Sequence, residues 1–426
     1  LDMVRIEDFA TRYLGEDTGI AAVEDVQTLS VTQEGAVQWT AIQSVMRHQH
    51  DGRMYNVRAR NGREISVTPD HSLMVFDGES MCIEAKPPRE LGETDYLLQP
   101  VSVPDTANAA SSIDVLSLVE DGYVILDSET PDNVFEPLYE ENIGDNKRRY
   151  NWKSRKNLPL EVAREIQVDR EHIIGVYTHK RDCYVPPSVD VEDFARLVGL
   201  FVADGTFGDN RIEFYAADTD DVSELSEFKN VIRAVCPKIP ISVFENGKNC
   251  QRLRVSGPLR NVLANLGLEN GARDKHIPPL ILSNQSAYES FVDGVVLGDG
   301  HRQTRTRNRA MTTVSTSSER LRAGLGFVLS ALSHVGGNYK RETTVPIRSG
   351  DQDTVPNNLI RFNPNRRDKQ SRLAMTPFTE RLQETYQDIP RYESKQADSG
   401  PVIESGLGNR QRLNEDELEL LLERSN

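Results

Sequence analysis

The sequence predicts an α+β protein in which a β-rich segment precedes two similar α/β repeats that pack through a central pair of helices. Apolar and polar residues alternate between Trp39 and Phe76, as they do in strands with one buried face. Two later stretches look like copies of each other: LVGLFVADG at 197–205 and VDGVVLGDG at 292–300. Each is too long for a typical strand and suits a buried helix, so a duplicated helical unit follows the β-rich segment.

Length and composition limit the class of protein. The 426 residues suffice for two or three domains, and no apolar run approaches the length of a membrane span. The first residues, LDMVRIEDF, lack the basic and then apolar pattern of a secretory signal. We therefore expect a soluble cytoplasmic protein without a membrane partner. The net charge of −16 disfavours DNA binding unless the basic residues gather on one face.

The β-rich segment is expected to begin with a strand at Met3–Ile6 and to include a hairpin. Tyr55 and Val57 alternate with polar residues before Asn61-Gly62, a pair typical of a tight hairpin turn. The alternation then resumes, which places two antiparallel strands on either side of this turn.

The hairpin is followed by a Thr-x-x-His pair, Thr68 and His71, within ISVTPDHSLMVF. Taken alone, this spacing is most often a turn with an ordinary histidine. With MVRIED before it and IEAKPPRELGETDYLLQP after it, the pair resembles a block of the Hint fold of inteins. The resemblance implies that His71 assists rearrangement of the first peptide bond, that Thr68 helps to orient it, and that the partners are the exteins of a host protein.

A basic and aromatic stretch, KRRYNWKSRK, lies at 147–156 inside an otherwise acidic connecting region. Arg149, Trp152 and Lys153 are candidates for phosphate contacts and base stacking, because that mixture of side chains suits nucleic acids. A solvated basic loop that offsets the nearby acids explains the same residues equally well.

Each apolar run ends in an acid and a glycine, which places Asp204 and Asp299 in the last turn of a helix. Glycine is usual there because it enters the left-handed region without strain. A carboxylate faces the negative end of the helix dipole, so it is unfavourable without a cation. Two such acids side by side would therefore bind a divalent metal. The alternative is that each Asp-Gly pair only ends a helix.

Small residues four positions apart would allow the two helices to approach closely. Gly199 and Ala203 lie in the first run, and Gly294 and Gly298 lie in the second. Such spacing forms a groove along one helix face, so the two backbones can pack together and present both acids at one end.

Similar elements are expected after each acid. The first copy continues with a strand at 211–215 and a helix at 221–235, and the second with a strand at 303–314 and a helix that begins near Ser317 and Glu319 and ends at Gly336. In the second strand, period two places alternate polar residues on one face, where we expect DNA contacts rather than an ordinary half-exposed strand. These residues are Gln303, Arg305, Arg307 and Arg309.

Both apolar runs resemble the LAGLIDADG, or dodecapeptide, motif of homing endonucleases, with departures at Val202, Asp293 and Leu297. The resemblance implies that Asp204 and Asp299 hold magnesium and that one monomer cuts both strands of a long double-stranded DNA site. It also implies a basic residue in each half, for which Lys340 is a candidate in the second.

The order of segments is that of an endonuclease that interrupts a Hint domain. The chain opens on Leu1 and ends on Ser425-Asn426, so we expect the nucleophile and the closing splicing blocks of an intein to be missing. The alternative is a splicing element whose nuclease has decayed into a DNA-binding or structural insert. The predicted segments are a partial Hint domain at 1–104, a connecting region at 105–185, repeats at 186–285 and 286–391, and a linker with a short acidic helix at 392–426.

Overall fold

The computed structural model describes residues 1–367, except 60–61, 81, 93, 99, 101–102, 105–109, 218–222, 247–249, 306–308, 333, 340–341 and 347–351. The chain has two compact units, one of residues 1–2 and 106–301 and the other of residues 3–105 and 302–426. Each unit contains both helices and strands, so the mixed α and β content that the sequence predicts is confirmed. Within the described part of the chain, no helix is long and apolar enough to cross a lipid bilayer.

The N-terminal segment is β-rich, as predicted, but it begins with a helix. Helix α1 covers Ile6–Leu14, so the strand expected at Met3–Ile6 is wrong. Its sequence is amphipathic, and Phe9 and Ala10 pack into a small core with Val23 and Val45. Strands follow as β1 (Gly19–Ala22), β2 (Gln27–Val31), β3 (Val37–Ala41), β4 (Ser44–Arg47), β5 (Tyr55–Arg58), β6 (Glu64–Val67), β7 (Leu73–Asp77), β8 (Cys82–Lys86) and β9 (Asp95–Leu97).

The predicted hairpin is confirmed by the antiparallel pairing of β5 with β6, in which Tyr55 lies opposite Val67. The Ala59 amide donates to the Arg63 carbonyl at 2.7 Å and closes the turn. Gly62 has a φ of 84°, a conformation that favours glycine. Asn61 lies outside the described residues.

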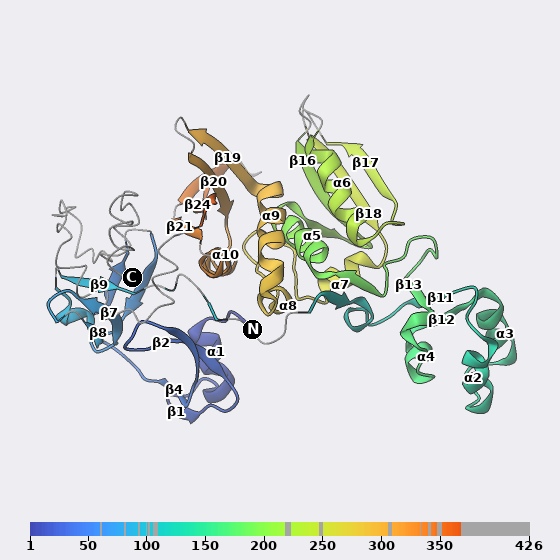
Figure 1. Ribbon diagram of the computed structural model, residues 1–426, viewed down its shortest axis with the longest axis horizontal. Coiled ribbons are helices and arrows are strands. Elements are labelled where there is room, and N and C mark those ends of the chain that lie inside the picture. The colour runs from blue at the N-terminus through green and yellow to red at the C-terminus, as the bar shows by residue number, and fades with distance from the viewer. Residues whose placement is uncertain are drawn as a thin grey trace, which may run out of the picture. The chain divides into compact units, whose positions relative to one another are not determined.

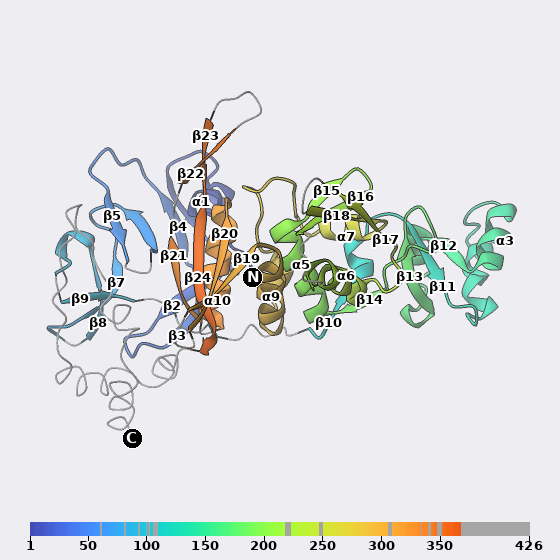
Figure 2. The same cartoon turned by 90° about the horizontal axis from the view of Figure 1, so that it is seen from above.

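The connecting region folds into a small module with its own three-stranded sheet, in the order β12-β11-β13 (Figure 2). Strand β11 covers Tyr123–Leu126, an apolar stretch within this region. The basic stretch forms helix α3 (Asn146–Arg155), so the interpretation of it as a loop is wrong. The other elements are β10 (Ser112–Asp114), α2 (Glu136–Glu140), β12 (Asn157–Pro159), α4 (Leu160–Glu165), β13 (Ile173–Tyr177) and β14 (Ser188–Asp190).

The first repeat consists of a helix and a four-stranded antiparallel sheet of order β15-β16-β18-β17, with helices on one face (Figure 1). Phe214 of β16 contacts Phe201 of α5 and Phe228 of α6, so this face of the sheet is the core. The elements are α5 (Val191–Asp204), β15 (Thr206–Gly208), β16 (Arg211–Ala217), α6 (Ser223–Val235), β17 (Ile241–Glu245), β18 (Cys250–Ser256) and α7 (Leu259–Ala264).

The second repeat has a sheet of order β19-β20-β24-β21, and hairpin β22–β23 projects from it (Figure 2). Two strands replace the single strand expected at 303–314. Helix α10 begins after Ser318, whose hydroxyl caps the Leu321 amide at 3.1 Å. The elements are α8 (Pro279–Leu282), α9 (Tyr288–Asp299), β19 (Gly300–Arg305), β20 (Arg309–Thr316), α10 (Glu319–Ala331), β21 (His334–Tyr339), β22 (Glu342–Pro346), β23 (Gln352–Pro356) and β24 (Asn358–Arg367).

The expected end of this helix at Gly336 is wrong. Gly336 lies in β21 and pairs with Phe362 of β24. The helix stops at Ala331 because the following residues add a strand to the sheet, and the ring of His334 contacts that of Phe362 at 5.9 Å between centroids. Strand pairing therefore decides the boundary, although a glycine five residues later offers a local stop signal.

Candidate active site

Helices α5 and α9 lie side by side in one unit (Figure 1) and touch through their small residues. A Cβ atom added to Gly199 would lie 2.1 Å from the Phe291 carbonyl oxygen, and one added to Gly294 would lie 2.1 Å from the Arg196 carbonyl oxygen. Neither distance can accommodate a side chain, because the obstacle on both helices is backbone. The glycines therefore permit a backbone approach that any other residue would prevent.

The same contact continues to the ends of the two helices. A Cβ atom on Gly298 would lie 2.5 Å from the Ala203 Cβ and 3.1 Å from Oδ2 of Asp204. The Asp204 carboxylate thus lies against Gly298 of α9, and Gly298 directly precedes Asp299. The close packing of the helices brings the two acids together at one end of the pair.

The glycines after the acids are needed for a different reason from the one predicted. Gly205 and Gly300 have φ values of −81° and −82°, so neither enters the left-handed region. At each of these glycines the backbone instead folds back tightly on the preceding helical turn. An added Cβ would lie 2.6 Å from the Phe201 carbonyl oxygen at Gly205 and 2.2 Å from the Val296 carbonyl oxygen at Gly300. Close approach, not positive φ, requires glycine here.

The surroundings of the two acids make their ionised forms unfavourable. Asp204 is half-buried, and burial together with the charges of Asp299 and Glu224 raises its pKa to about 7. Asp299 is open to solvent on one side, yet the protein atoms around its carboxyl raise its pKa to about 6. The charge of Lys275 opposes both shifts. An additional cation at this position would favour both anions.

Lys275 is the basic residue of this cluster, and sequence reasoning missed it. Its Nζ donates to the carbonyl oxygens of Phe201 at 3.0 Å and Gly205 at 2.6 Å, and it lies 4.2 Å from the centroid of the Phe201 ring. Burial lowers its pKa to about 8, although Asp299 and Asp204 oppose this. It supplies the positive charge that the end of α5 requires. No spacing in the sequence links it to Asp204, because the two come together only in the folded chain.

The pair of acids fits a divalent cation with oxygen ligands. Magnesium usually binds proteins through one or two carboxylates and takes its other ligands from water and substrate phosphates. Among the described residues, neither acid belongs to a cluster of three or more candidate metal ligands. Backbone carbonyl oxygens, water or a bound substrate could supply the remaining ligands of such a cation.

The structure does not place Arg149 where a phosphate could reach it. Its guanidinium is buried and donates to the carbonyl oxygens of Ile143 at 2.9 Å and Gly144 at 2.5 Å, while it lies over the ring of Tyr139. Arg149 therefore holds the loop before α3 in place, and its interpretation as a DNA contact is withdrawn. No local pattern in the sequence indicated that Arg149 would be buried among backbone acceptors.

The other two candidates of α3 remain accessible. Lys153 is partly exposed and pairs with Asp132 at 3.0 Å, which lowers the pKa of that acid. Trp152 is half-buried, and its ring fills the space that a side chain at Gly144 would need. A phosphate contact at Lys153 would have to compete with this acid.

The candidates of the second repeat lie on two strands. Gln303 and Arg305 are in β19, and Arg309 is in β20. Arg307 and Lys340 lie outside the described residues. The period-two argument that places four residues on one face therefore fails after Arg305, because it assumes one continuous strand.

A basic cluster that the sequence analysis did not select lies on the first repeat. Arg211, Arg252 and Arg254 surround Glu213 on the sheet face opposite the helices. The alternation R-x-E-x-Y in β16 and R-x-R in β18 carried this signal, since period two places those residues on one face of paired strands.

Thr68 and His71 form a turn between β6 and β7. The His71 amide donates to the Thr68 carbonyl oxygen at 3.2 Å, and the imidazole is exposed. The geometry leaves the side chain accessible. It is equally that of an ordinary turn.

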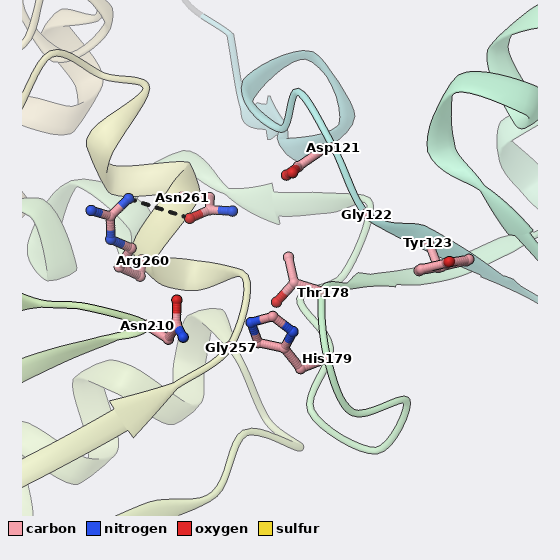
Figure 3. Close-up of a pocket in the computed structure, with 9 residues that line it drawn as sticks. All are labelled: Asp121, Gly122, Tyr123, Thr178, His179, Asn210, Gly257, Arg260 and Asn261. Carbon is pink, nitrogen blue, oxygen red and sulfur yellow. Dashed lines mark hydrogen bonds between the residues drawn. The ribbon is translucent and has the colours of Figure 1, made fainter.

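A polar cavity of about 280 Å³ opens in the unit that holds the acids, where the chain before β11 meets the ends of β13 and β18 (Figure 3). Gly122 and Gly257 contribute backbone with φ values of 135° and 120°. None of the residues predicted for the site lines this cavity. Its lining consists of Asp121, Gly122, Tyr123, Thr178, His179, Asn210, Gly257, Arg260 and Asn261.

Fold and site together define an α+β protein with paired carboxylates at the ends of two closely packed helices. The sequence matches the family model of the intein splicing domain over residues 2–398, and the chain belongs to that family.

Its relatives include several proteins that act on nucleic acids. The chain is 23% identical to the DNA-directed RNA polymerase subunit Rpo1C of Methanocaldococcus jannaschii over 332 residues, 76% of this chain and 32% of that protein. It is 24% identical to a DNA polymerase of Thermococcus sp. over 475 residues, 91% of this chain and 26% of that protein. The chain thus spans about a third or less of the length of these relatives.

Solved structures of the homing endonuclease I-DmoI are also similar. The structure of I-DmoI in complex with DNA and Mn shares 16% identity over 44% of this chain and 97% of that chain, with a TM-score of 0.27.

Proposed function

We propose that the chain is an intein-associated homing endonuclease that hydrolyses both strands of a long DNA site with magnesium. The observation that carries this proposal is the pair of carboxylates, Asp204 and Asp299, at the ends of α5 and α9 beside the buried Lys275. Its substrate partner is double-stranded DNA, and its host partners are the exteins. One chain contains both acids, so a monomer suffices for both strands.

The two acids and Lys275 would have different roles because their charges are opposite. Asp204 and Asp299 would bind the cation as anions, although their pKa values of about 7 and 6 leave Asp204 only partly ionised at neutral pH without it. A bound magnesium ion would stabilise the attacking and leaving oxygens of the phosphodiester. Lys275, with a pKa near 8, would keep its proton and hold positive charge beside both acids and the scissile phosphate.

The test is cleavage of a supercoiled plasmid that carries the flanking coding sequence joined without this segment. The wild-type chain should yield linear plasmid with magnesium and none with EDTA. Asp204→Asn and Asp299→Asn should each abolish the linear product while DNA affinity and melting temperature hold. The exposed Asp293 of α9 supplies the matched control, since Asp293→Asn removes the same charge from the same helix away from the site.

Two outcomes would contradict the proposal. Full cutting by either asparagine variant would show that the acids only end the helices. Binding without cutting by the wild-type chain, with magnesium present, would favour the decayed nuclease. A parallel Lys275→Met variant should also lose cutting, because it removes the positive charge beside both acids.

A further inference from the structure

Three arginines and one glutamate form a cluster on the open face of the first sheet. Strand β16 contributes Arg211 and Glu213, and β18 contributes Arg252 and Arg254. The strands pair so that Glu213 lies opposite Arg254, which places all four side chains on one face. The intervening residue Phe214 is fully buried and points to the helices, so the cluster faces away from the core.

Glu213 is the common partner of the three guanidinium groups. Its Oε1 accepts from Nε of Arg211 at 2.7 Å and lies 2.8 Å from Nε of Arg254, and its Oε2 lies 3.8 Å from Nη1 of Arg252. The Tyr215 hydroxyl donates to Oε2 at 3.3 Å. One carboxylate therefore fixes the positions of all three arginine side chains.

An aromatic ring supports the same array from the neighbouring strand. Phe244 of β17 lies 4.6 Å from Cζ of Arg254 and 5.8 Å from Cζ of Arg252, measured to the ring centroid. Both distances are within the range of cation–π attraction. The two arginines of β18 are thus held by a ring as well as by the carboxylate.

The charges of the cluster do not balance. Three guanidinium groups face the carboxylate of Glu213, and Asp209 adds a second negative charge near Arg211, which leaves one positive charge in surplus. Burial alone would raise the pKa of Glu213, but the hydrogen bond from Arg211 and the charges of Arg252 and Arg254 outweigh it and lower the pKa. Within the described residues, the Nη atoms of Arg211 and Arg254 make no hydrogen bond.

We infer that Glu213 is a positioning residue, which holds the three arginines in a fixed array for the phosphates and base edges of the DNA site. This inference rests on the proposed function. An arginine side chain loses rotamer entropy when it is fixed, so an array that is ordered before binding loses less when DNA arrives. Without the carboxylate, the like charges would repel and separate.

The substitution Glu213→Gln distinguishes positioning from simple electrostatics, because the two predict opposite signs. If charge alone mattered, removal of a negative charge beside DNA would tighten binding to every duplex. If Glu213 positions the arginines, affinity for the joined flanking duplex should fall about tenfold, while affinity for a scrambled duplex holds or rises. Fluorescence anisotropy at several salt concentrations measures both.

Two further variants keep this test decisive. Glu245→Gln removes an exposed acid from the same sheet and should leave the preference for the site unchanged. Arg254→Lys keeps the charge but loses the planar group that both Glu213 and Phe244 hold, so it should weaken site binding without changing the salt slope. Arg254→Lys provides the test of the inference if melting curves show that Glu213→Gln fails to fold.

Equal or tighter site binding by Glu213→Gln would overturn the inference and leave the proposed function intact. The same holds if Arg254→Lys binds the site as the wild-type chain does. A wild-type chain without any preference for the joined flanking duplex would overturn the proposed function itself, and this inference with it.

Discussion

The two repeats have the same order of helices and strands and differ by one added hairpin. In each, a helix leads into two strands, a second helix and two more strands, and the sheet orders β15-β16-β18-β17 and β19-β20-β24-β21 correspond strand for strand. The second repeat adds hairpin β22–β23 between its third and fourth sheet strands. The insertion falls in a connection, where extra residues leave the pairing of β24 with β20 and β21 unchanged.

The acids at the helix ends differ more than the sheets do. Asp204 is half-buried and lies near Glu224, whose charge raises its pKa further, whereas Asp299 is exposed, and the charge of Lys275 opposes the rise in both. Lys275 also bonds to the carbonyls at the end of α5. Similar sequence motifs therefore provide acids with unequal surroundings.

The largest expected effect tests the symmetry of the helix contact. Gly199→Ala and Gly294→Ala should each destabilise the fold by about 3 kcal/mol or more, because each new Cβ would meet a backbone oxygen at 2.1 Å. The gain in helix propensity, roughly 1 kcal/mol, is smaller. Urea unfolding measures both variants.

Gly208→Ala is the control for this pair. Its added Cβ would meet only side-chain atoms of Arg211, the nearest at 3.0 Å, and a flexible side chain can move. We expect a small change in its free energy of unfolding. Wild-type stability in either helix variant would show that α5 and α9 do not pack as closely as described, and unequal losses would show that one helix yields more easily.

A smaller effect compares the two acids through pH. Both pKa values lie above the ordinary 3.8, so the folded chain binds more protons than the unfolded chain between about pH 4 and 7. Stability without metal should therefore rise as the pH falls from 7 to 5, a range in which Lys275 is protonated in both the folded and the unfolded chain. We expect about 1–2 kcal/mol, since one pKa unit equals about 1.4 kcal/mol and solvent screens both acids.

Asparagine variants separate the two contributions. Asp204→Asn should flatten the pH dependence more than Asp299→Asn, because the Asp204 carboxyl is less exposed and also lies near the charge of Glu224. Chemical denaturation in EDTA at pH 5, 6 and 7 measures the difference. Equal slopes would show that the two acids have equivalent surroundings, and a rise of stability from pH 5 to pH 7 would contradict the raised pKa values.

Local sequence patterns predicted the features that depend on residues close together in the sequence. Apolar runs gave the two helices, small-residue spacing gave a means of packing them, and acid-glycine ends gave Asp204 and Asp299. The failures depend on distant contacts. Lys275 reaches the end of α5 across 70 residues of sequence, and Arg149 is buried by the fold of its own loop. Strand pairing ended α10 early.

The smallest expected effect compares the arginines of the two repeats through the salt dependence of DNA binding. Each lost phosphate contact should reduce the log-log slope by roughly 0.9. The triple alanine variant of Arg305, Arg307 and Arg309 therefore tests whether the second repeat also contacts DNA. Because Arg305 and Arg309 lie on different strands, their single variants should act independently of each other.

The control for the salt slope is Arg149→Ala, which removes an arginine whose donors are already used within the protein. It should lower stability, because the Ile143 and Gly144 carbonyls would lose their donor, and it should leave the slope unchanged. If the slope falls for Arg149 and not for the second repeat, the contact surface lies on the connecting module instead. If the triple variant lowers the slope by the amount expected for three lost phosphate contacts, the second repeat also binds the DNA backbone.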